Sequence, residues 1–157
     1  MIEQFQDHLT FKNIYLYTNF VVIPFWLMIM LVPNSKLKKI LVNSIVLPLI
    51  FSSTYIFIIY KMIIFEESFF QVFQLYLDLD NLYTIFSTEG FLLIFWLHFV
   101  SINLLLGSWI ASDSIKYNVP RSILTISLIF VYFTGPVGIV LYWFFRIFYA
   151  KKINLYD

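Results

Sequence analysis

The sequence predicts an all-α integral membrane protein of four antiparallel transmembrane helices, with a short interfacial helical segment between helices 2 and 3. The 157 residues are 61% hydrophobic and 12% charged, whereas soluble domains are about 45–50% apolar and about 25% charged. Apolar runs near residues 14–32, 40–65, 91–111 and 122–148 can each cross a hydrocarbon core of about 30 Å. Short connections after the first and third runs favour antiparallel neighbours within one domain, 1–157, with both termini on one side.

The first two runs are separated by a short basic segment. Pro24 lies inside the run 14–32, where it frees a backbone carbonyl and calls for a neighbouring helix, and Pro33 follows the run. Residues 34–39 contain three lysines and are expected to form the turn into the second run. That run, 40–65, is long enough to tilt in a bilayer.

The connection 66–90 is acidic and also rich in aromatic and aliphatic residues. Leu82, Ile85 and Phe86 share one helical stripe, which predicts one or two short helices lying in the membrane interface, with Asp80 as an N-cap. Two interpretations stay open for this segment: a loop that skims the membrane, or a lid over whatever the helices bind.

The third run, 91–111, carries the deepest ionisable side chain, His98. Polar groups inside a membrane usually face a partner or a cavity. On a helical wheel Trp109 and Asp113 lie within about 60° of His98, and Asn103 lies about 140° away. We therefore expect His98 and Asn103 to border a wedge that faces the interior of the bundle.

The fourth run, 122–148, combines small residues with a phenol and a guanidinium. On one continuous helix Gly135, Gly138, Tyr142 and Arg146 fall on the same face. Pro136 is expected to kink this helix by removing one backbone hydrogen bond.

Composition excludes several kinds of chemistry. The chain has no cysteine, so disulfides, thiolate metal sites and a cysteine nucleophile are excluded. Its two histidines, His8 and His98, are too few for a di-iron or bis-histidine haem site, so no metal or other cofactor is expected. A net charge of +1 argues against nucleic acid as a partner, and the acidic N-terminal segment is unlike a cleaved targeting peptide. The function classes that remain are metal-free proton chemistry and ligand binding without a reaction.

Motifs along the chain carry a family resemblance. They are PFWL at 24–27, WLH at 96–98, Gly107, Trp109-Ile110, Asp113, Gly135-Pro136, Gly138 and Tyr142. Their order and spacing resemble those of the abscisic-acid-deficient-four-like membrane proteins, whose plant member is associated with neoxanthin synthesis from violaxanthin. The resemblance covers nearly the whole chain.

The resemblance implies a membrane protein that binds or acts on a carotenoid-like polyene (a xanthophyll), by a metal-free isomerisation of an epoxide to an allene. His98 and Asn103 would be the catalytic residues. Substrate-binding roles would fall to Trp96, Trp109, Asp113, Gly135, Pro136 and Tyr142. The alternative is a non-catalytic pigment-binding or scaffold subunit. Expected partners are membrane lipid, the polyene, and further copies of the chain or other subunits of a complex, in a bacterial cell membrane or a thylakoid or plastid membrane.

The chain departs from the family pattern at two positions. Asn103 stands where the family carries an aspartate five residues after the histidine, and Ser108 stands where it carries an arginine before the Trp-Ile pair. An amide cannot exchange protons, so a mechanism that uses that carboxylate is not open to Asn103. Because an acid and a base are lost together, we hypothesise that they form an ion pair in relatives, which favours the non-catalytic alternative here.

Overall fold

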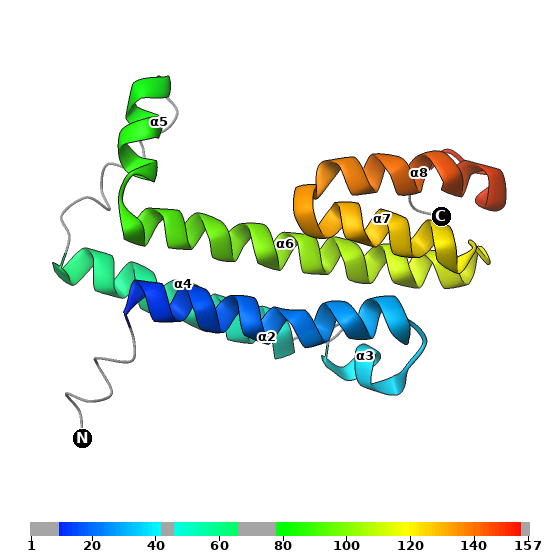
Figure 1. Cartoon of the computed structure of the whole chain (residues 1–157), viewed down its shortest axis with the longest axis horizontal. Helices are drawn as coiled ribbons and strands as arrows, with labels where there is room; N and C mark the ends of the chain where they lie inside the picture. The colour runs from blue at the N-terminus through cyan, green and yellow to red at the C-terminus, as the bar shows by residue number, and fades with distance from the viewer. Residues whose placement is uncertain (1–9, 42–45, 66–77, 155–157) are drawn as a thin grey trace. The chain divides into compact units, whose positions relative to one another are not determined.

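The structure is a computed structural model that describes residues 10–41, 46–65 and 78–154, and these residues form helices joined by short turns. The helices are α2 (Phe11–Leu31), α3 (Lys36–Leu41), α4 (Val46–Phe65), α5 (Leu79–Phe86), α6 (Glu89–Lys116), α7 (Arg121–Thr134) and α8 (Pro136–Ala150) (Figure 1). The predicted all-α class is confirmed.

The first and third apolar runs lie in α2 and α6. Among the described residues these two helices are long and apolar enough to cross a membrane. Pro24 lies inside α2 without ending it. α6 has 28 residues, about 42 Å of helix, and extends past the predicted run at both ends. It ends before Asn118, whose left-handed backbone (φ 52°) cannot continue a helix.

The second predicted run, 40–65, is divided. Its C-terminal part forms the 20-residue α4, whereas Ile40 and Leu41 belong to α3, which begins at Lys36. The expectation that 34–39 is only a turn is therefore wrong. Lysine and leucine are good helix formers, so this segment starts a helical turn of its own. Residues 42–45 lie outside the described residues.

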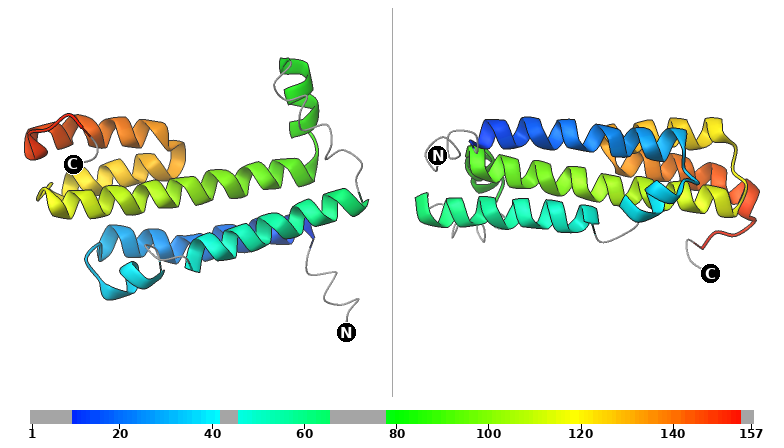
Figure 2. Two further views of the ribbon diagram at one scale, coloured as in Figure 1. Left: turned by 180° about the vertical axis from the view of Figure 1, so that it is seen from behind. Right: turned by 90° about the horizontal axis from the view of Figure 1, so that it is seen from below.

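The prediction of a single helix over 122–148 is also wrong. The chain reverses at Gly135, and α7 and α8 pack side by side as an antiparallel hairpin (Figures 1 and 2). They have 14 and 15 residues, about 21 and 22 Å, too short to cross a core of about 30 Å. The four predicted crossings are therefore not confirmed, and the expectation that both termini share one side, which rests on them, stays a prediction.

Gly135 and Pro136 explain the reversal. Gly135 has φ 61° and ψ −84°, and its N–H donates to the Val131 carbonyl at 2.9 Å. A proline disfavours helical backbone at the preceding residue and is well suited to the first position of a new helix. Pro136 therefore begins α8 instead of kinking one long helix. At Gly138 an added Cβ would meet the Val131 backbone, so glycine allows the two helices to approach closely.

The short helix α5 confirms the predicted helical segment before the third run. Its N-cap is Asp78, not Asp80, because the Asn81 N–H donates to Asp78 Oδ1 at 2.7 Å. Phe86 at the end of α5 contacts Phe91 and Phe95 of α6, with ring centroids 5.3 and 4.9 Å apart. Residues 66–77, the rest of the predicted interfacial segment, lie outside the described residues.

The chain divides into two compact units. The first consists of Met1–Val21 and Pro48–Phe99, with buried apolar side chains that include Ile14, Ile58 and Leu97. The second consists of Val22–Leu47 and Val100–Asp157. Its buried core includes Trp26, Ile110, Leu128 and Val131. α2 and α6 each contribute to both units.

Candidate functional site

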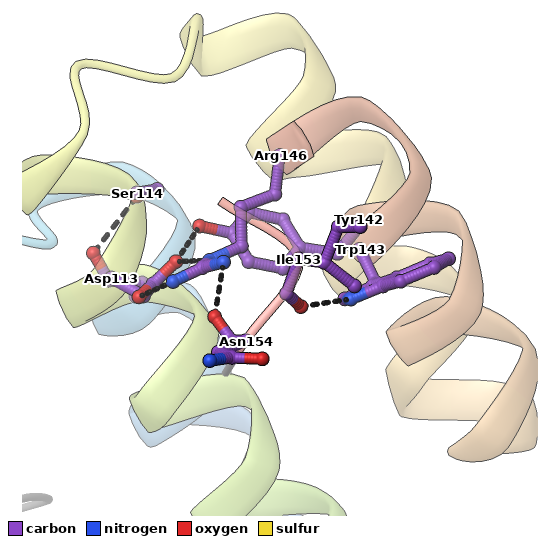
Figure 3. Close-up of polar contacts among 8 residues, drawn as sticks. Asp113, Ser114, Tyr142, Trp143, Arg146, Ile153 and Asn154 are labelled. Atoms are coloured by element: carbon purple, nitrogen blue, oxygen red, sulfur yellow. Dashed lines mark hydrogen bonds and ion pairs between the residues drawn. The ribbon is translucent and has the colours of Figure 1, made fainter. Parts of the chain in front are cut away.

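A buried cluster of an acid, a phenol and a guanidinium joins α6 to α8 in the second unit. Tyr142 Oη donates to Asp113 Oδ2 at 2.7 Å, and Arg146 Nε donates to the same oxygen at 2.6 Å (Figure 3). Arg146 Nη2 donates to Asp113 Oδ1 at 3.2 Å, which completes a two-pronged ion pair. Tyr142 and Arg146 are one helical turn apart on α8, so both face the carboxylate.

The rest of the Arg146 guanidinium is also occupied. Nη1 donates to the carbonyl oxygen of Asn154 at 3.0 Å, and the guanidinium carbon lies 4.7 Å from the centroid of the Tyr117 ring. The exposed fractions of Arg146 and Tyr142 are 1% and 0%. Asp113 Oδ2 accepts two hydrogen bonds and Oδ1 accepts one, so protein donors use most of the acceptor capacity of this buried carboxylate. The cluster is suited to anchoring α8 and the C-terminal segment on the end of α6.

The structure brings together three of the predicted site residues in this cluster. Asp113 and Tyr142 are bonded directly, and the Trp109 ring meets the Tyr142 ring edge to face at 6.1 Å. Sequence reasoning missed the partnership of Arg146 with Asp113. The signal was present, because Asp113 and Arg146 are opposite charges at the ends of apolar runs, and buried charges are normally paired.

Three more of the predicted residues lie together at the tip of the hairpin. Asn103 of α6 is buried against Gly135, where an added Cβ would lie 2.5 Å from Asn103 Oδ1. Pro136 follows at the start of α8 and is exposed. Asn103 Nδ2 is buried and has no hydrogen-bond partner in the described part of the chain, and the same is true of Ser127 Oγ.

His98 does not lie in a bundle interior, so that expectation is wrong. Its side chain is exposed, together with Phe95, Ile102 and Leu105, all within about 60° of it on the helix. We call these four residues the outer face of α6. Across the ranges described, the imidazole makes no hydrogen bond. Asn103 points about 140° away and is buried, so α6 does not bring the two predicted catalytic side chains together.

Trp96 is placed separately, in the first unit. Its indole Nε1 donates to Asn19 Oδ1 at 3.0 Å, and Asn19 Nδ2 donates to the Tyr15 carbonyl at 3.0 Å. The Trp96 ring lies 5.6 Å from the rings of Tyr15 and Phe99. These contacts bind the start of α6 to the start of α2.

No group of three or more His, Asp or Glu side chains that could hold a metal ion occurs in the described ranges.

The comparisons with known proteins agree with the motifs. The profile of a family described as ABA DEFICIENT 4-like matches residues 13–142, which confirms the resemblance. The matched region contains every predicted site residue, whereas Arg146 lies beyond it. No curated protein and no solved structure matches the chain.

Proposed function

The chain belongs to the ABA DEFICIENT 4-like family, and we propose that it is an integral membrane protein that binds a carotenoid-like polyene and acts on it at the outer face of α6. The proposal has three parts: the membrane as the environment, a lipid-soluble ligand, and His98 as the group that contacts the reacting part of that ligand.

The membrane environment is supported by the exposed apolar surface. Large apolar side chains are exposed along all the longer helices, with exposed fractions of 70% for Phe20, 65% for Ile56 and 66% for Phe148. Soluble monomers rarely expose extended apolar patches, whereas a bilayer covers such a surface. Helices are also one of the two structures that satisfy their own backbone in lipid.

The exposed position of His98 carries the proposed site. A polar side chain facing lipid is costly unless a partner satisfies it. A polyene dissolved in the bilayer can reach this imidazole directly, without entering the protein. A neutral imidazole is both a donor and an acceptor, so it can hold a ligand oxygen or accept a proton.

The reaction that fits this group is the isomerisation of an epoxide to an allene. In this reaction one carbon loses a proton, the epoxide C–O bond breaks, and the released oxygen gains a proton, so there is no net redox change. One imidazole can take the proton from carbon and return it to oxygen. Phe95, three residues before His98 on the same face of α6, would support the apolar chain of the polyene.

A non-catalytic role in pigment binding is the second candidate. It is supported by Asn103, which points away from His98 and cannot exchange protons. In that case the outer face of α6 would hold a polyene for another subunit.

The experiment supplies an epoxidised carotenoid such as violaxanthin to the purified protein in detergent, and separates the pigments by chromatography. We expect wild type to form the allenic isomer, and His98→Phe to lose this activity while its helix content stays unchanged. Ile56→Phe, at an exposed position of α4 outside this face, is the matched control and should stay active. If wild type retains the pigment without converting it, the non-catalytic role is correct; if it neither retains nor converts it, the polyene proposal is wrong.

A further inference from the structure

The first unit contains a cavity of about 410 Å³ between the starts of α2 and α6. Its apolar walls include Phe11 and Tyr15 from α2, and Leu92, Leu93 and Trp96 from α6. The volume lies in the range of about 300–1,000 Å³ that is typical of small-molecule sites. The cavity can therefore hold one cyclic group of a ligand, while a longer apolar chain would extend out of it.

One face of each helix builds the cavity. Glu89, Leu92 and Trp96 follow one another at steps of three and four along α6, as expected for a single helical face. Trp96 and His98 are two residues apart, about 200° around the helix. The cavity therefore lies on the opposite side of α6 from His98 and forms a separate site.

The walls of the cavity are held in place by polar contacts behind them. The Asn19 amide accepts from the Trp96 indole and donates to the Tyr15 carbonyl, each at 3.0 Å. The Asn19 amide thus uses its oxygen as an acceptor and its nitrogen as a donor. These two bonds favour one orientation of the indole against the Tyr15 ring. Such a preformed aromatic wall lowers the cost of ordering side chains when a ligand binds.

Two opposite charges complete the lining. Lys12 and Glu89 both border the cavity and are exposed, and they form no ion pair with any residue that the structure describes. Each lies in the first turn of an apolar helix, where a membrane-spanning segment would meet water. An ammonium donates hydrogen bonds and a carboxylate accepts them, so together they can satisfy a hydroxyl group.

We propose that this cavity binds the hydroxylated ring at one end of a polyene. The ring would lie between Tyr15, Leu92 and Trp96, and its hydroxyl would bond to Lys12 and Glu89. The choice of a polyene rests on the proposed function, whereas the preference for a hydroxylated ring follows from the cavity. The bound molecule would not contact His98.

The test compares zeaxanthin, which carries a hydroxyl on each ring, with its hydrocarbon counterpart β-carotene. Each is offered to the detergent-purified full chain, and the pigment retained after size exclusion is measured by absorbance. We expect wild type to retain zeaxanthin at least about tenfold better, because hydrogen bonds to charged groups are the stronger class. Leu92→Trp, which fills the cavity, should lower zeaxanthin retention to the level of β-carotene, whereas Ile56→Trp, at an exposed position of α4 outside both proposed sites, should keep the preference.

Two further variants separate this site from the catalytic one. The double variant Lys12→Met, Glu89→Met should bind both pigments equally, and His98→Phe should retain zeaxanthin like wild type. Zeaxanthin retention by Leu92→Trp equal to that of wild type would overturn the cavity proposal and leave the proposed function intact. If wild type retains neither pigment, the polyene assignment fails for both sites.

Discussion

The Asp113 carboxylate depends on two donors from α8, and this dependence can be measured. Arg146→Met should lower the free energy of unfolding by about 3–5 kcal/mol, because it leaves a buried carboxylate without its counter-charge. Adding Asp113→Asn should restore most of that loss, since the neutral amide can still accept from Tyr142 Oη. Chemical unfolding in micelles, followed by circular dichroism, gives both values.

A different result would change the interpretation of the cluster. If the double variant loses as much as the sum of the two single variants, the charges act independently and the ion pair does not anchor α8.

Asn103 differs from Asp113, because its buried amide nitrogen has no hydrogen-bond partner in the described residues. Asn103→Leu, which has a similar shape, should leave stability within about 1 kcal/mol of wild type or raise it, since it removes an unsatisfied donor. Asn103→Asp should cost several kcal/mol, because it buries a carboxylate beside the Gly135 backbone. Thermal unfolding of the two variants measures both effects. If Asn103→Asp raised the stability, the hypothesis that relatives have an ion pair at this position would be refuted.

At the scale of elements, the α7–α8 hairpin depends on Gly135. Gly135→Ala should lower stability for two reasons: a strained backbone with φ 61° and ψ −84° costs about 1–3 kcal/mol for a residue with a Cβ, and that Cβ would lie 2.5 Å from Asn103 Oδ1. In the background of Asn103→Ala only the first cost remains. The coupling energy from the double-mutant cycle should therefore be clearly nonzero, and additive effects would show that the two residues do not touch.

The same hairpin marks the limit of prediction from sequence. Hydrophobic length predicted α2 and α6 well, whereas only the C-terminal part of the run 40–65 forms α4. It failed at 122–148, since two half-length helices and one full-length helix have the same composition and a similar helical period. The Gly135-Pro136 pair was the available signal, because this dipeptide marks turns. The hydrogen bonds of Asp113 depend on that turn. A helical wheel could therefore place Tyr142 and Arg146 on one face, but it could not place either of them beside Asp113.

For the whole molecule, the family and the chemistry of the candidate residues were more predictable than their placement. The order of motifs around His98, Asp113 and Tyr142 identified the family. Periodicity within one helix cannot tell which side is exposed when every side is apolar, as in α6. The outward position of His98 and the cavity on the other side of α6 come from packing between helices, which single-helix patterns do not contain.

For the membrane protein proposed above, the hairpin predicts that α7 and α8 make no full crossing. Single cysteines can test this, because the chain has none of its own. Ser122 lies at the start of α7, and Lys152 follows the end of α8; both are exposed. A hairpin returns to the side it left, so Ser122→Cys and Lys152→Cys should react with a membrane-impermeant maleimide from the same side of sealed vesicles. Val137→Cys, exposed near the tip of the hairpin, should resist labelling from either side. A fourth full crossing would instead place positions 122 and 152 on opposite sides, so that only one of them labels before permeabilisation.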